Sequence, residues 1–113
     1  MSLNYTPEFK RALRKLSRRY RSLRGDLTPL LIELEAGKTP GDQLQSGGRY
    51  TAFKVRVKNS DSLKGKSGGY RVIYYLKSSD QTVLTTLYSK SEQSDIPVEE
   101  LRRIIEKYEG SGS

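Results

Sequence analysis

The hydrophobic pattern of this chain changes its period twice, and this limits the folds that the chain can adopt. In residues 9–34 apolar side chains recur every three or four positions, which is the spacing of one helix face. In residues 49–88 they alternate with polar side chains or form short β-branched and aromatic runs, as in strands. Helical spacing returns in residues 98–108. The sequence therefore predicts an α+β domain with helices on both sides of a sheet-forming segment.

A short strand and a basic helix are expected first. Ser2–Tyr5 has the character of a strand, and Thr6 and Pro7 form a typical helix start, an N-cap hydroxyl followed by proline at the first helical position. We expect Gly25 to end this helix. Its apolar stripe steps by four, three, four and three residues: Phe9, Leu13, Leu16, Tyr20 and Leu23. The other faces are rich in Lys and Arg.

A second helix is expected to begin near Asp26 or Thr28, with Pro29 just inside it and Gly37 as its C-cap. Because only about three residues would join the two helices, we expect them to form an antiparallel hairpin. The following stretch, residues 38–48, is rich in Gly, Gln, Ser and Pro and is predicted to be a loop.

Three strands are predicted to form an antiparallel meander. Apolar and cationic side chains alternate from Arg49 to Lys58, which gives a strand with one apolar and one cationic face. Tyr70–Leu76 is a buried strand, Ser78–Gln81 is a hairpin turn, and Thr82–Tyr88 is the last strand. The short connections favour a meander, to which the N-terminal strand adds.

A last helix is expected after Asp95, which would cap it, with Glu99 and Glu100 in its first turn. We assign residues 1–109 to one domain and residues 110–113 to a linker or tail. The sequence has no apolar run of membrane-spanning length, no recognisable signal peptide and no Cys, so we expect a cytoplasmic protein.

The charge of the chain favours a polyanionic partner. The net charge is +8, and residues 1–25 and 49–77 each carry eight Lys or Arg against one acidic residue. The chain also lacks His, which together with the absence of Cys removes the commonest general base and the usual zinc ligands. We therefore expect no metal and no cofactor, and any catalysis must use Lys, Arg, Tyr, Ser, Asp or Glu.

The glycine-rich stretch near residue 66 invites comparison with a nucleotide-binding phosphate loop. Gly65, Lys66 and Ser67 match the end of that motif, but Ser60 stands where the motif requires glycine. A strand rather than a helix is expected to follow, so no helix N-terminus is available to bind phosphate. The sequence argues against a nucleotide-binding loop.

A group of cations is spread over the three meander strands. Lys54 and Arg56 share one face of the first strand, Arg71 opens the second, and Lys90 follows the third. In a meander these four can converge at one end of the sheet, and we take them as candidate catalytic residues. The alternative is that they only decorate a solvent-facing surface. Ile73 and Tyr75 share the parity of Arg71 and argue against a purely solvent-exposed face.

Further cations and aromatic rings are candidates for binding RNA. Tyrosine is abundant, with eight Tyr against two Phe, and stacking of bases on tyrosine beside cations is a common way to hold single-stranded RNA. The RNA-binding candidates are Lys58, Lys64, Lys66, Tyr50 and Tyr88.

Four segments of the chain resemble the RelE/ParE superfamily of toxins, and the RelE-like and HigB-like branch in particular. They are Phe9–Leu13, Phe53–Val57, Gly68–Tyr75 and Tyr88–Ile96. The resemblance implies a RelE-like fold and a type II toxin that cleaves messenger RNA in the ribosomal A site, without a metal. It also implies a cognate antitoxin, which we expect to be acidic where it covers the cationic sheet face.

The resemblance also implies roles for individual residues. The basic residues of the ribonuclease members match Lys54, Arg56, Arg71 and Lys90, whereas Ser91 stands where some relatives carry a second catalytic arginine. Pro97 falls about where they carry a catalytic tyrosine, and Lys66 and Lys90 are the candidates to replace these groups. Arg71 is expected to stabilise the pentacoordinate phosphorane. The assignment of base and acid among the lysines stays open.

Three other interpretations remain. A ParE-like gyrase inhibitor would use the same fold for protein binding without nuclease chemistry, and a non-catalytic RNA-binding module or an inactivated family member would keep the basic surface. The presence of all four candidate catalytic cations argues against the gyrase inhibitor, because such a toxin needs no cationic catalytic face.

Overall fold

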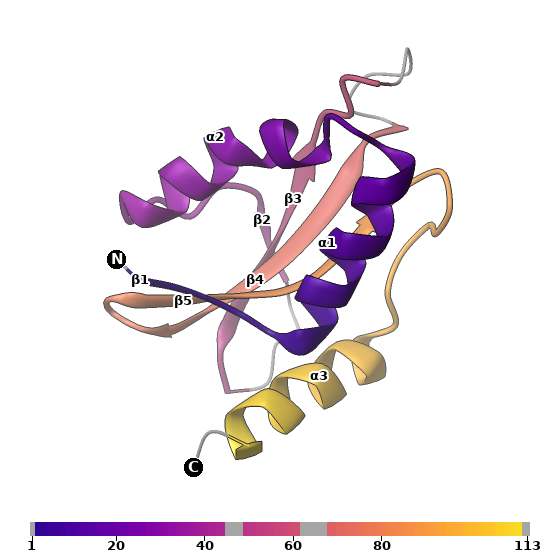
Figure 1. The fold of residues 1–113 in the computed structure, drawn as a ribbon. Coiled ribbons are helices and arrows are strands. Elements are labelled where there is room, and N and C mark those ends of the chain that lie inside the picture. The colour runs from indigo at the N-terminus through magenta and orange to yellow at the C-terminus, as the bar shows by residue number, and fades with distance from the viewer. Residues whose placement is uncertain (1, 45–48, 62–67, 112–113) are drawn as a thin grey trace.

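One sheet organises the chain (Figure 1) in a computed structural model that describes residues 2–44, 49–61 and 68–111. The strand order is β1-β5-β4-β3-β2, and β4 is therefore the central strand. β3, β4 and β5 form the predicted antiparallel meander, and β1 pairs parallel with β5. The strands are β1 (Ser2–Tyr5), β2 (Asp42–Gln43), β3 (Thr51–Val57), β4 (Tyr70–Ser78) and β5 (Gln81–Ser89).

Helices cover both faces of this sheet. α1 (Pro7–Arg19) and α2 (Leu23–Glu35) pack on one face, and α3 (Val98–Ser111) packs on the other. The predicted α+β class, the N-terminal pair of helices and the C-terminal helix are confirmed. Figure 1 shows that α2 leaves α1 at a steep angle rather than lying along it.

The start of α1 is as predicted, but its end is not. The Thr6 hydroxyl accepts a hydrogen bond from the Phe9 N–H at 3.0 Å, and Pro7 is the first helical residue. α1 ends at Arg19, where Tyr20 turns extended, so the expectation that Gly25 ends the helix is wrong. Gly25 lies inside α2 instead.

The reason is the spacing of the leucines in α2. Leu23 is completely buried and opens a stripe that continues through Leu27, Leu30 and Leu34 at steps of four, three and four. The helix therefore starts earlier than predicted, and Pro29 lies inside it rather than in its first turn.

The C-terminal end of α2 is closed by glycine, as predicted. Gly37 has a φ of 86°, its N–H donates to the Leu34 carbonyl, and the Lys38 N–H donates to the Glu33 carbonyl, both at 3.0 Å. These two bonds form a Schellman motif.

The predicted loop over residues 38–48 is wrong at Asp42–Gln43, which pairs with β3.

Alternation along the strands builds a separate apolar cluster on each face. The cluster under α1 and α2 includes Tyr70, Val72 and Tyr74 of β4. The next residues in the same strand, Ile73 and Tyr75, join the cluster under α3. The face of β4 that carries Arg71 is therefore covered by α3 over part of its length. This agrees with the expectation from Ile73 and Tyr75 that this face is not purely solvent-exposed.

α3 begins at Val98, three residues after the predicted cap. Glu99 and Glu100 lie in its first turn as expected. The carboxylate of Asp95 points elsewhere, as described below. The helix continues through Gly110 to Ser111, two residues into the segment expected to be a tail.

Candidate active site

The end of the sheet that α3 leaves uncovered forms a hollow of about 310 Å³. Its walls come from β2, β3, β4, β5 and the segment between β5 and α3. The residues that line it are Asp42, Lys54, Arg56, Arg71, Tyr88, Lys90 and Ser94, which we call the cationic pocket. All four cations predicted to be catalytic therefore lie in one place, together with one of the predicted RNA-binding tyrosines.

Strand register explains this convergence. Arg56 of β3 lies opposite Arg71 of β4, and Arg71 lies opposite Tyr88 of β5, so these three residues form one row across the sheet. Lys54 lies opposite Asp42 of β2 in the adjacent part of the pocket. Like charges directly opposite each other destabilise an antiparallel pair, so the Arg56–Arg71 pair favours binding of an anion between them.

Arg71 is the most enclosed of these cations. Only 6% of its surface is exposed, and its guanidinium donates to the Tyr70 carbonyl at 3.2 Å. It lies on the central strand, not at a sheet edge. Its guanidinium is thereby held in place at the floor of the pocket, where it can present hydrogen-bond donors to an oxyanion.

A β-bulge brings Tyr88 to the pocket. Ile73 pairs with Thr86 and Tyr74 pairs with Leu84, so Thr85 is an extra residue in β5. Because side chains alternate along a strand, this one residue moves Tyr88 to the face of Arg71. The Thr85 carbonyl accepts a hydrogen bond of 2.7 Å from the buried Thr6 hydroxyl, which also caps α1. The cap of α1 thus fixes the bulge.

Asp95 joins three groups at the rim of the pocket. Its Oδ1 accepts hydrogen bonds from the Ile96 N–H at 2.8 Å, the Tyr88 hydroxyl at 3.2 Å and the Lys54 ammonium at 3.3 Å. The Ile96 N–H, followed by the charge of Lys54, holds the pKa of Asp95 below its ordinary value. Burial and the charge of Asp95 raise the pKa of Tyr88 to about 12. Tyr88 is therefore a neutral hydroxyl near neutral pH.

Lys90 orders the segment that follows β5. Its ammonium donates to the Ser94 carbonyl at 2.7 Å, and its backbone N–H donates to the Gly69 carbonyl at 2.9 Å. Ser91 shares a hydrogen bond of 3.0 Å with Ser89 and is not among the residues that line the pocket. Lys90 is thus the cation that this segment supplies.

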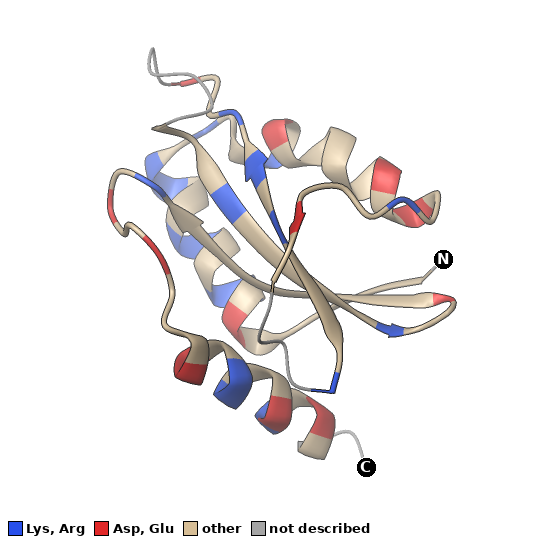
Figure 2. Cartoon of the chain, turned by 180° about the vertical axis from the view of Figure 1, so that it is seen from behind, with Lys and Arg blue, Asp and Glu red and all other residues tan. Residues whose placement is uncertain are grey.

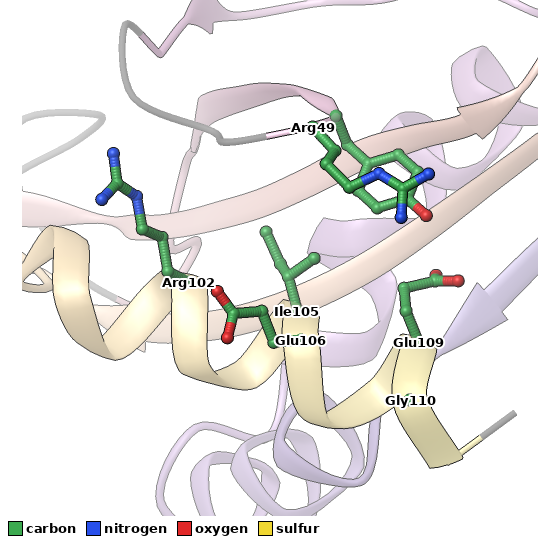
Figure 3. Close-up of a pocket in the computed structure, with 7 residues that line it drawn as sticks. Arg49, Arg102, Ile105, Glu106, Glu109 and Gly110 are labelled. Atoms are coloured by element: carbon green, nitrogen blue, oxygen red, sulfur yellow. The ribbon is translucent and has the colours of Figure 1, made fainter. Parts of the chain in front are cut away.

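The other predicted RNA-binding residues lie elsewhere. Tyr50 lines a second hollow of about 590 Å³ at the opposite end of β3, between the sheet and α3 (Figure 3). Its ring packs on Tyr75 with centroids 5.0 Å apart. Lys58 lines a hollow between α2 and β3. Lys64 and Lys66 lie outside the described residues.

The acidic residues at the pocket were not predicted from the sequence. Asp42 of β2 lines the pocket, and Asp95 of the segment before α3 lies at its rim, where it accepts hydrogen bonds from Lys54 and Tyr88. Asp95 was expected to cap a helix, and Asp42 was placed in a loop. The spacing of either residue gives no signal of its position, because both depend on how distant segments pack.

Among the described residues, no cluster of three or more acidic side chains is arranged to hold a metal ion. The chain itself contains neither His nor Cys. The polar side chains that line the cationic pocket are those of Lys, Arg, Tyr, Ser and Asp.

Comparison with known families agrees with this geometry. Residues 9–109 match the family model described as the RelE toxin of the RelE / RelB toxin-antitoxin system. The chain belongs to the RelE toxin family. It is therefore a toxin of a toxin-antitoxin system, and the family implies a cognate antitoxin. None of the described helices of this RelE-family toxin is long and apolar enough to span a membrane.

Proposed function

We propose that this RelE-family toxin is an endoribonuclease that cleaves messenger RNA on the ribosome. The observation that carries the proposal is the convergence of Lys54, Arg56, Arg71 and Lys90 in one pocket, although they come from two strands, β3 and β4, and from the segment that follows β5. Concentrated cations at a partly enclosed site suit a phosphodiester substrate whose negative charge increases in the transition state.

The chemistry proposed is attack of the RNA 2′-OH on its own 3′-phosphate. This requires removal of the 2′-OH proton, stabilisation of the phosphorane and protonation of the 5′-oxygen leaving group. Arg71 and Arg56 face each other across β3 and β4 and are assigned to the phosphorane oxygens. Lys54 and Lys90 are the candidates for proton transfer, and the order of their roles stays open.

Dependence on the ribosome follows from what the pocket lacks. Its cations attract phosphates, but cationic side chains do not by themselves align a 2′-OH with the phosphate. In-line placement of reacting groups is worth roughly 7–11 kcal/mol of activation barrier. A decoding site that already holds the message can supply that placement. The cognate antitoxin is proposed to neutralise the toxin by covering this cationic face.

The test is to incubate the purified toxin with one transcript, with and without programmed ribosomes, and to map the 5′ ends. We expect cuts within codons only on ribosomes, and only salt-sensitive binding to naked RNA. Equal cleavage in both reactions would identify a free ribonuclease instead. Absence of cleavage in both, with gyrase inhibition, would identify the other activity found on this fold.

A further inference from the structure

A second set of cations lies on α1, away from the cationic pocket. α1 packs on the opposite face of the sheet from the pocket and from α3. Figure 2 shows basic residues along α1 as well as on the strands. Four exposed cations of α1 form what we call the α1 patch: Lys10, Arg14, Lys15 and Arg18.

The charge of the α1 patch is not balanced within the part of the chain that is described. Two carboxylates at α1 are engaged with other cations: Glu8 pairs with Arg11 at 3.8 Å and with Lys107 at 3.9 Å, and Glu92 pairs with Arg19 at 3.5 Å. No ion pair with a described carboxylate occurs at any of the four patch residues.

The spacing of the patch is that of a continuous stripe. Lys10, Arg14 and Arg18 follow one another at four-residue intervals, which places them roughly 6 Å apart along the helix axis. Like charges at this spacing weaken an isolated helix. None of these side chains is buried in the core, so packing does not explain them, and all four are accessible to an external polyanion.

The C-terminal end of α1 is linked to the segment that forms the rim of the cationic pocket. At the C-terminal end of α1, Glu92 accepts a hydrogen bond from the Tyr20 hydroxyl at 3.3 Å and pairs with Arg19. Glu92 belongs to the segment that also carries Lys90 and Asp95. A polyanion along α1 would therefore end beside the rim of the pocket while leaving its mouth on the other sheet face open.

We propose that the α1 patch docks on the phosphate backbone of double-helical ribosomal RNA. This inference rests on the proposed function, in which the pocket takes single-stranded messenger RNA. A row of cations on a helix does not provide the paired hydrogen-bond donors and acceptors that recognise individual bases. It does match a regularly spaced row of phosphates. Double-helical RNA is recognised mainly in this way, by its shape and by backbone contacts.

The test compares binding of a variant with three patch residues neutralised. Arg14→Gln, Lys15→Gln and Arg18→Gln keep good helix formers at exposed positions, so the fold should be retained. The probes are an RNA duplex of about 16 base pairs and vacant ribosomes. We expect a loss of affinity of ~10- to 100-fold at about 0.1 M salt, with a salt slope lower by roughly two to three.

A matched control removes the same charge elsewhere. Lys38→Gln, Lys77→Gln and Arg103→Gln neutralise three exposed cations outside α1, and this variant should lose less than about threefold. Replacing Arg14 and Arg18 by Lys should retain most of the affinity, because the charge is kept. If the two triple variants lose the same affinity, only net charge matters and the proposal is wrong.

Two further outcomes separate this proposal from its alternatives. If wild type binds a poly-glutamate peptide of equal charge as tightly as the duplex, and the patch variant loses both equally, the surface fits an acidic protein and the proposal is overturned. Because duplex binding requires no cleavage, a toxin that binds through α1 without cutting RNA would refute only the proposed function. Cleavage with duplex binding independent of α1 would refute only the docking surface.

Discussion

The two faces of the sheet use the same strands for opposite purposes. On one face, α1 and α2 cover an apolar cluster that includes Leu34, Tyr74 and Leu84, all of them fully buried. On the other face, α3 covers only part of the sheet, and the uncovered end places Arg56 opposite Arg71. Alternation in β3 and β4 thus supplies a packed core on one side and opposed charges on the other.

This difference indicates how a chain with a small apolar content can hold a site that is unfavourable by itself. Like charges directly opposite each other weaken an antiparallel strand pair, and enclosing a guanidinium costs free energy unless it is paired. The helix-covered face provides the burial that offsets them, because each fully buried leucine contributes roughly 1.5–3 kcal/mol. Variants on the two faces should therefore separate activity from stability.

The largest effect is expected from Arg71→Ala on the pocket face. Loss of a charge contact made in the transition state typically lowers the rate ~100- to 1,000-fold, about 3–4 kcal/mol. Cleavage on programmed ribosomes at matched toxin concentration measures this. Arg71→Lys retains the charge but not the planar fork, so it should recover only part of the rate.

Because Arg71 is enclosed on the central strand, its removal also needs a folding control. Thermal unfolding followed by circular dichroism should show a cooperative transition for both variants. A folded Arg71→Ala protein with wild-type cleavage would remove the cationic pocket from the mechanism.

The matching change on the helix-covered face is Leu34→Ala. Leu34 is fully buried in the cluster under α1 and α2, and such truncations destabilise proteins by about 2–5 kcal/mol. Denaturant unfolding measures the loss. Cleavage per folded molecule should stay near that of wild type, because Leu34 belongs to the cluster on the opposite face and is not among the residues that line the pocket. A large loss of specific activity would show that the two faces are not separable.

The two faces also differ in how much of their structure could be predicted from the sequence. Alternation placed Lys54 and Arg56 together, and the meander brought Arg71 near them, so much of the cationic pocket was predictable. The position of Tyr88 was not fully determined, since simple alternation puts it on the face of Leu84 and only the bulge at Thr85 reverses this. The residue pattern of β5 does not predict this bulge.

Other elements depended on competition between local signals. Gly25 and Pro29 suggested a helix boundary, but burial of Leu23 outweighed them and extended α2 toward the N-terminus. Asp95 had the features of a helix cap, yet its carboxylate meets Lys54 and Tyr88 instead. These outcomes rest on tertiary contacts between segments far apart in the chain, which local spacing does not encode.

An intermediate effect is expected from Thr6→Val, which connects the two faces. It removes the cap of α1 and leaves the buried Thr85 carbonyl without its partner, a combined loss of about 2 kcal/mol. Although this is a smaller destabilisation than that of Leu34→Ala, specific activity should fall further, because the bulge aligns Tyr88. Thr6→Ser, which keeps the hydroxyl, should restore both stability and cleavage. Equal specific activity of Thr6→Val and Leu34→Ala would mean that the bulge does not need this anchor.

The smallest effect is expected from Asp95→Asn and depends on pH. The Asp95 side chain is 63% exposed and its ion pair with Lys54 spans 3.3 Å, so solvent screening limits the pair to below about 1 kcal/mol. The pKa of Asp95 is lower in the folded protein than its ordinary value of 3.8.

A carboxyl with a lowered folded pKa stabilises the protein above its ordinary pKa, and this stabilisation disappears as the pH falls through the folded value. Wild type should therefore unfold at a slightly higher temperature than Asp95→Asn at pH about 7, and the two melting temperatures should converge on acidification below the ordinary value. Melting curves of both proteins across this range measure the difference.

Lys54→Met removes the ion pair from the other side, but the Ile96 N–H still lowers the pKa of Asp95 in that background. Asp95→Asn should then have a smaller effect than in wild type, and part of the pH dependence should remain. A constant difference between wild type and Asp95→Asn at every pH would show that the carboxylate charge of Asp95 does not stabilise the rim of the pocket.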